Sequence, residues 1–182
     1  MRINCLILAG LFAAPYLPAL SVGTPAYADA IQDANRLLQV TDAGKQFNST
    51  ALEQTQNILR TYSSIVSMWA ETKLPQQVKL SIAACYEEAY AWENFESGIA
   101  GILAQNLTVK EMRLLIDFNR NLGLPPNQIP TFKTAIAKSR KIQQMTAEYI
   151  YANSDGCVDR DAELILGYLY DQRRQENTLA AE

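Results

Sequence analysis

The segment from Tyr151 to Glu163, YANSDGCVDRDAE, places three aspartates, an asparagine, a glycine and a cysteine within thirteen residues. A calcium loop of the EF-hand type needs oxygen ligands at positions one, three and five, a glycine at position six and a bidentate glutamate at position twelve. With Gly156 at position six, Tyr151 falls on position one and Ala162 on position twelve. Two of the required ligands are missing, so calcium is not expected here.

The same segment is better explained as a turn between two helices. Gly156 can adopt the left-handed conformation that ends a helix. Asp159 and Asp161 would then lie at the start of the next helix, where negative charge interacts favourably with the helix dipole. Cys157 would tie this turn to an earlier helix through a disulfide. We therefore predict a helix corner fixed by a covalent bond.

The first 28 residues have the pattern of a cleaved secretory signal. Arg2 gives a short positive region, residues 5–14 are apolar, and Ala26-Tyr27-Ala28 provides the small-x-small cleavage pattern. This apolar run is too short to span a membrane, which takes about twenty residues. We expect Asp29 to be the first mature residue and the protein to be periplasmic or secreted in a bacterium. An uncleaved N-terminal anchor is the alternative.

Cys85 and Cys157 are the two cysteines that would remain after cleavage, because Cys5 lies in the signal. An even number of cysteines in an exported protein favours one disulfide over two free thiols. The bond would close a long loop and, by chain entropy, destabilise the unfolded state by roughly 4 kcal/mol. Two buried free thiols remain the alternative, because a sequence does not give the distance between them.

The composition limits the possible functions. The net charge is −3, and loss of the signal with its single basic residue would change it to −4. A mildly acidic chain argues against nucleic acid or an anionic membrane as the main partner, and no segment after the signal is apolar enough to span a membrane. The chain has no histidine, which removes the usual neutral-pH acid or base and His-ligated zinc. Two cysteines cannot complete a structural zinc site, and glycine-rich phosphate-binding motifs are absent. We expect no metal, no cofactor and no catalytic residue.

Helical periodicity runs through the rest of the chain, and no pattern indicates a β-hairpin. The predicted helices cover residues 29–40, 46–71, 75–90, about 95–103, 108–122, 130–153 and 159–174. Short connections between amphipathic helices predict a single all-α domain over residues 29–176, a bundle of about six helices. Residues 177–182 are expected to form a frayed tail.

Two local signals are sharper than the periodicity. Thr108 and Glu111 have the spacing of a capping box, in which each side chain bonds the backbone N–H of the other residue. Gly98 and Gly101 weaken a helix by up to about 1 kcal/mol each relative to alanine. We therefore expect another helix to cross close to these glycines.

The stretches RLLQVTDAG, residues 36–44, and ILAQNLTVKEMRLLIDF, residues 102–118, resemble the domain-of-unknown-function 2059 family. The matching residues are Leu37, Leu38, Thr41, Leu107, Thr108, Glu111, Met112 and Phe118. The chain departs from the family after Phe118, where it lacks the tyrosine and the Ser-Pro step of the family's turn. The resemblance implies an exported, all-helical bacterial domain, and it transfers no catalytic residue.

The stretch WENFESGIAGILAQ, residues 92–105, is similar to the region around the catalytic glutamate of lytic transglycosylases. By that resemblance Glu96 would be the general acid of a muralytic glycosidase. In those enzymes a loop separates the Glu-Ser pair from the glycine segment, whereas here Gly98 and Gly101 would share a helix with Glu96. Glu93 and Glu96 are three residues apart, so an exposed side of one helix is the favoured explanation.

Several aromatic side chains could line a ligand groove between helices. The candidates are Tyr86, Tyr90, Trp92 and Tyr149. Packing at the edge of the core is the alternative. From these observations we predict a non-catalytic binding or interaction module whose partner is another protein or component of the cell envelope. A carrier or sensor of an apolar ligand or lipid is the second hypothesis, and the glycosidase that uses Glu96 is the third.

Overall fold

The computed structural model describes residues 25–154 and 156–180, which are almost entirely α-helical and contain no strand. The helices are α1 (Pro25–Val40), α2 (Ala43–Ala70), α3 (Gln76–Ala89), α4 (Glu96–Asn106), α5 (Val109–Asn119), α6 (Ile129–Ala137), α7 (Ser139–Asn153) and α8 (Cys157–Leu179). Two short 3-10 helices, η1 (Trp92–Asn94) and η2 (Pro126–Gln128), join α3 to α4 and α5 to α6. The all-α class is confirmed, but eight α-helices in the described part exceed the predicted six. None of them is long and apolar enough to cross a membrane.

The ends of the helical region differ from the predicted bounds. Residues 1–24 of the predicted signal lie outside the described residues. Helix α1 begins at Pro25, so the predicted cleavage site after Ala28 falls near the start of this helix. At the other end, α8 continues to Leu179. The predicted frayed tail therefore begins inside a helix, and its last two residues lie outside the described part.

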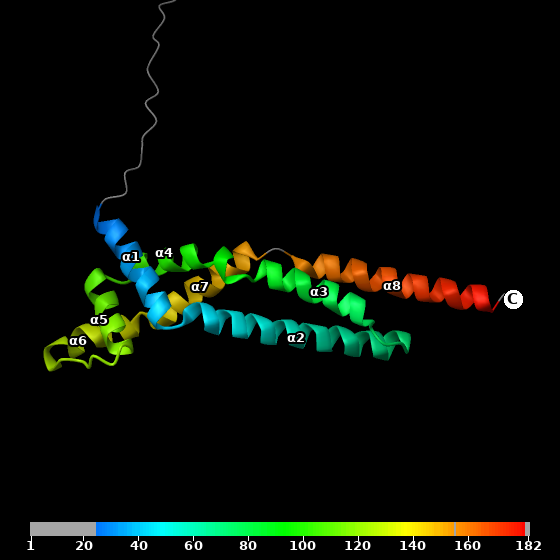
Figure 1. The fold of residues 1–182 in the computed structure, drawn as a ribbon, viewed down its shortest axis with the longest axis horizontal. Helices are drawn as coiled ribbons and strands as arrows, with labels where there is room; N and C mark the ends of the chain where they lie inside the picture. The colour runs from blue at the N-terminus through cyan, green and yellow to red at the C-terminus, as the bar shows by residue number, and fades with distance from the viewer. Residues whose placement is uncertain (1–24, 155, 181–182) are drawn as a thin grey trace, which may run out of the picture.

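The helices form two regions, which Figure 1 shows side by side. The head consists of α1, α4, α5, α6 and α7, and α1 packs against both α4 and α5. The arm consists of α2, α3 and α8, with α3 packed against each of the other two. The apolar core of the head is formed by the buried side chains of Ala30, Ala34, Leu37, Leu38, Phe95, Ile99, Ala100, Leu103, Leu107, Met112, Ile116 and Ala135.

The arm has a smaller core, whose buried members are Val66, Leu74, Ile82, Tyr86 and Cys157. At its far end, the Tyr168 hydroxyl of α8 lies 3.3 Å from the Lys73 carbonyl oxygen in the α2–α3 connection. The half-buried Tyr90, just past the end of α3, packs against both cores. The two regions are therefore in direct contact through this side chain.

The predicted helix over residues 130–153 is broken at Lys138. The backbone N–H of Lys138 bonds the Ala135 carbonyl three residues back, at 3.2 Å, which tightens the last turn of α6. Helix α6 packs on α5, whereas α7 packs on α4. One straight helix could not follow both neighbours. The break was not predicted because no proline or glycine marks it.

The capping box is confirmed: the Glu111 N–H donates to Thr108 Oγ1 at 3.2 Å, and the Thr108 N–H donates to Glu111 Oε2 at 2.8 Å. The close approach is confirmed at Gly98, where an added Cβ would lie 2.1 Å from Cζ of Tyr149 on α7. The prediction of a close approach is wrong at Gly101, where an added Cβ would meet nothing within 4 Å.

Candidate binding groove

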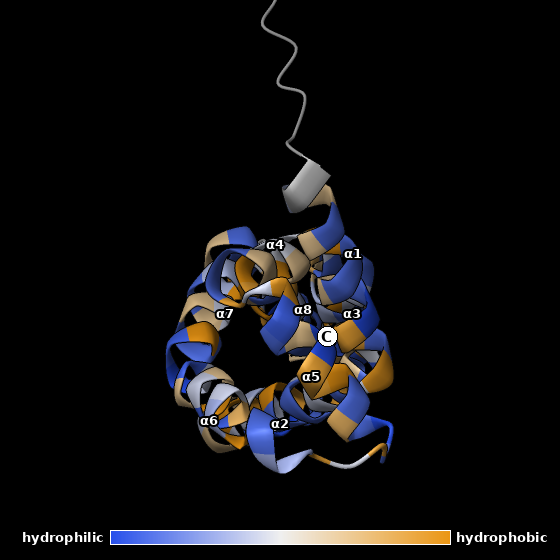
Figure 2. Ribbon diagram, turned by 90° about the vertical axis from the view of Figure 1, so that its left-hand side faces the viewer, coloured by the Kyte–Doolittle hydropathy of each residue, from blue (hydrophilic) through white to orange (hydrophobic). Residues whose placement is uncertain are grey.

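A groove of about 940 Å³ lies between the first half of α2, the end of α3, and helices α4 and α7. Figure 2 looks along the long axis and shows these helices arranged around the middle of the molecule. Aliphatic residues from four helices contribute to the lining: Leu38, Ala51, Ile58, Ile99, Ile142 and Ile150. The polar lining residues carry amides or hydroxyls, such as Gln46, Gln54, Thr55, Gln143 and Thr146. No charged side chain is among the described residues that line it.

Three of the four aromatic residues singled out in the sequence lie at this groove. Tyr86, Tyr90 and Trp92 line it. They belong to a row of neighbouring rings, in which Tyr86 and Tyr90 are stacked with centroids 6.2 Å apart and Tyr90 lies 6.3 Å from Phe95. Tyr149 instead packs edge-on against Phe95, with the centroids 6.3 Å apart. The row runs from the arm into the head, so the groove spans the junction of the two regions.

Trp92 is held in place by close contacts on α2. Its ring centroid lies 5.5 Å from that of Phe47. A Cβ built on Gly44 would lie 3.0 Å from the Trp92 ring, so a glycine at the start of α2 leaves room for the indole. Because Phe47 and Trp92 both line the groove, one end of it is walled by two packed aromatic rings.

Tyr86 connects the groove to a buried carboxyl group in the arm. Its hydroxyl donates a 2.9 Å hydrogen bond to Oδ2 of Asp161, whose side chain is fully buried. Oδ1 of Asp161 has no hydrogen-bond partner among the described residues. Burial raises the pKa of Asp161, and hydrogen bonds from Tyr86 and Tyr62 offset only part of that rise. Burial also raises the pKa of Tyr86 well above its ordinary value, and the Asp161 hydrogen bond adds to the rise.

The predicted disulfide is present beside this carboxyl group. Cys85 and Cys157 are bonded, and their Cα atoms lie 5.9 Å apart. Cys85 precedes Tyr86 directly, and Cys157 lies one helical turn before Asp161. The bond therefore fixes α8 against α3 at the point where Asp161 meets the Tyr86 hydroxyl.

The corner that opens α8 differs in part from the prediction. Cys157 and Asp159 lie in the first turn as expected. Asp161 is buried, because it faces α3 rather than the solvent at the helix start. Gly156 is not left-handed, since its φ is −69°. Helix α7 ends instead at Asn153, and Ser154 after it has an extended backbone. Within residues 25–154 and 156–180, no group of three or more acidic or cysteine side chains could hold a metal ion.

The burial of Asp161 was missed by the sequence analysis. A signal was available once the disulfide was predicted. Residues one turn apart point to the same side of a helix, so Asp161 faces the same way as Cys157. That direction leads to α3 and to Tyr86, the residue next to Cys85.

Glu96 is the first residue of α4 and is half-buried, whereas Glu93 belongs to η1 and is exposed. The spacing of three residues had predicted that the two carboxylates share one helix. This prediction is wrong, because they lie in η1 and α4. Gly98 and Gly101 lie in the same helix as Glu96, as expected. The residues that line the groove include neither Glu93 nor Glu96.

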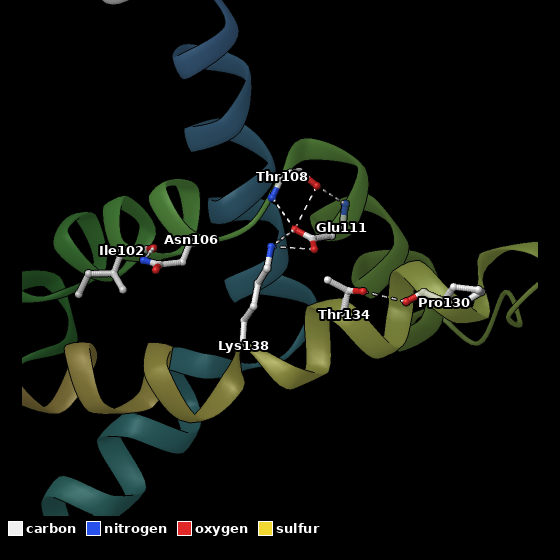
Figure 3. Close-up of polar contacts among 7 residues, drawn as sticks. All are labelled: Ile102, Asn106, Thr108, Glu111, Pro130, Thr134 and Lys138. Carbon is white, nitrogen blue, oxygen red and sulfur yellow. Dashed lines mark hydrogen bonds and ion pairs between the residues drawn. The ribbon is translucent and has the colours of Figure 1, made fainter.

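A partly buried ion pair, which Figure 3 shows, joins α5 to the break between α6 and α7. Nζ of Lys138 lies 2.7 Å from each carboxylate oxygen of Glu111, which is 4% exposed. Burial alone would raise the pKa of Glu111, but hydrogen bonds from Lys138 and Thr108 outweigh it and leave the pKa below its usual value. The pair fastens the Lys138 break to the first turn of α5.

Comparisons of the chain with protein-family models, with curated proteins and with solved structures give no match. The resemblance to the domain-of-unknown-function 2059 family stays a prediction. Of the residues that carry it, Leu37, Leu38, Leu107 and Met112 are buried in the head. Thr108 and Glu111 form the helix cap. These positions build the fold, and of the six only Leu38 also lines the groove.

Proposed function

We propose that this protein is a non-catalytic binding module of the bacterial cell envelope, and that the groove holds the apolar part of its ligand. The observation that carries the proposal is an open space of about 940 Å³ whose described lining has aliphatic and aromatic side chains and no charge. Sites for small ligands usually have about 300–1,000 Å³ and a mainly apolar lining with a few polar groups. The groove lies within this range.

The lining also favours binding over catalysis. Hydrolytic chemistry needs an acid or a base within hydrogen-bond reach of the substrate. The titratable groups at the groove are the phenols of Tyr86 and Tyr90. The Tyr86 hydroxyl already donates a hydrogen bond to Asp161.

A location in the envelope is part of the proposal. The Cys85–Cys157 bond supports it, because disulfides persist mainly in oxidising compartments. The predicted N-terminal signal supports it independently.

Docking of a protein partner is a second candidate function, and it would use a different surface. At the far end of α2, Ile65, Met68 and Trp69 are 45%, 69% and 82% exposed. The three lie at i, i+3 and i+4, so they form one apolar stripe on the helix. Exposed stripes of this kind mark interaction surfaces in many proteins.

Blocking the groove tests the first proposal. Ala147 on α7 lines the groove and is exposed, so Ala147→Trp fills the space with little disturbance of the core. Ala152 is exposed on the same helix and does not line the groove, which makes Ala152→Trp the matched control. The probe is N-phenyl-1-naphthylamine, an uncharged apolar fluorophore.

We expect the wild-type protein and Ala152→Trp to bind the fluorophore equally. Ala147→Trp should bind it at least about tenfold more weakly, which corresponds to about 1.4 kcal/mol. Circular dichroism would show that both variants are folded. Equal binding by all three proteins, or none by the wild type, would contradict the proposal.

A further inference from the structure

A second, smaller cavity of about 440 Å³ adjoins the groove on the α2–α3 side. The two spaces share five lining residues: Ala51, Thr55, Tyr86, Tyr90 and Trp92. They are therefore neighbours, because these five residues border both spaces. The two spaces differ in charge: the groove has no charged residue in its described lining, whereas the smaller cavity is also lined by Glu87 and Glu93.

Both carboxylates are exposed, and neither forms an ion pair with any residue that the structure describes. The surrounding sequence adds to their field. Residues 80–109 contain four glutamates, at positions 87, 88, 93 and 96, and no lysine or arginine. This side of the groove therefore carries a negative potential without a neighbouring cation of the same segment to neutralise it.

The aromatic residues that border both spaces also favour a positively charged group. The faces of tyrosine and tryptophan rings carry a negative quadrupole and attract ammonium groups within about 6 Å of the ring centre. Tyr86, Tyr90 and Trp92 line the charged cavity as well as the groove. A cation in the smaller cavity would thus lie near two carboxylates and beside three aromatic side chains.

We propose that the ligand of this protein is a cationic amphiphile, with its apolar chain in the uncharged groove and an ammonium head in the cavity bordered by Glu87 and Glu93. This inference rests on the proposed function, and it adds the chemical class of the ligand. A carboxylate or phosphate head on the same chain would face two carboxylates and is disfavoured.

The test compares three amphiphiles with the same twelve-carbon chain and different heads: dodecyltrimethylammonium, dodecanol and dodecanoate. Each is used below the concentration at which it forms aggregates, and binding to the wild-type protein is followed by displacement of N-phenyl-1-naphthylamine. We expect the cation to bind about tenfold more tightly than the anion, from two exposed carboxylates and one aromatic wall. The preference should shrink in about 1 M salt, where the Debye length is about 3 Å.

The double variant Glu87→Gln/Glu93→Gln assigns the preference to these residues. We expect the affinity for dodecyltrimethylammonium to fall toward that for dodecanol, which removes most of the difference between the heads. The matched control is Glu163→Gln/Glu176→Gln, which removes the same charge from exposed positions on α8 and should keep the full preference.

The outcomes separate this inference from the proposed function. Binding of the three chains with equal affinity, or a preference that survives in Glu87→Gln/Glu93→Gln, would overturn the inference alone. Failure of the wild-type protein to bind any of the chains or the fluorophore would overturn both.

Discussion

The head and the arm each contain a buried carboxyl group with a shifted pKa, Glu111 and Asp161, and the two shifts are in opposite directions. Glu111 in the head accepts hydrogen bonds from Thr108 and from the Lys138 ammonium, which together hold its pKa below the usual value. Asp161 in the arm accepts a hydrogen bond from the Tyr86 hydroxyl, and its pKa is raised by burial. No described cation forms an ion pair with Asp161.

The difference shows how each region is stabilised. The head has a continuous apolar core with buried residues from α1, α4, α5 and α6, and its Glu111 carboxylate is paired and capped. The arm buries fewer apolar residues, and ionisation of Asp161 works against its folding because an unpaired buried charge is costly. We infer that the Cys85–Cys157 bond offsets this weakness by holding α8 on α3.

Removal of the disulfide is expected to have the largest effect and to act on the arm alone. In Cys85→Ala/Cys157→Ala the free energy of unfolding should fall by about 2–4 kcal/mol, because the unfolded chain regains the freedom of a long loop. Hydrogen exchange would locate the loss: amides of α8 should exchange faster, while those of α1, α4 and α5 stay protected. Faster exchange throughout the head would show that the two regions do not differ as we infer.

A pair of glycine variants tests the packing of the head. Gly98→Ala should lower the free energy of unfolding by about 1–3 kcal/mol, because the new methyl group would clash with the Tyr149 ring and force α4 and α7 apart. Gly101→Ala is the matched control on the same helix. With open space around it, this change should raise stability by up to about 1 kcal/mol. Urea denaturation measures both, and equal effects of the two changes would contradict the contact.

The smallest effect expected is on pH dependence, and its sign differs between the regions. A raised pKa in the folded state means that Asp161 favours folding most below its unfolded pKa of about 3.9, and that this contribution is lost as the pH rises through the folded pKa. Asp161→Asn keeps an oxygen for the Tyr86 hydroxyl and carries no charge. It should therefore be the more stable protein at neutral pH and lose its advantage in acid.

Glu111 provides the opposite case. Because its pKa is lowered, its contribution is present above about pH 4.3 and is lost on acidification. Glu111→Gln should therefore reduce stability at neutral pH and have less effect in acid. Urea denaturation across a series of pH values would check both variants. The same sign of change in both would show that the two carboxyl groups are alike after all.

The features that could be predicted from the sequence depend on short-range rules. The capping box depends on two residues three apart, and the disulfide was predicted from an even cysteine count in a chain with the pattern of a secretory signal. The close packing at Gly98 was predicted because a glycine weakens a helix, which is expected where another helix crosses nearby. Tyr86, Tyr90 and Trp92 were identified as groove candidates because aromatic residues are common in ligand sites, and the structure places all three at one groove.

The remaining features depend on which helices meet in space. The break at Lys138 arises because α6 and α7 follow different neighbours, and nothing in the local sequence marks it. Asp161 lies in an acidic segment typical of a helix start, yet contact with α3 buries its side chain. The charge-free lining of the groove combines residues from α1, α2, α3, α4 and α7 and from the α3–α4 connection, so no single segment of sequence displays it.

The position of the disulfide in the chain also sets the order in which the molecule can be completed. Every buried residue of the head core lies between Ala30 and Ala135, whereas the arm core needs Cys157 and the helix that follows it. Because synthesis starts at the N-terminus, the core of the head can form before α8 has been made. Until Cys157 has been added, Cys85 has no partner with which to form the disulfide. The arm core is therefore the last part of the molecule that can be completed, and the disulfide can form only at that point.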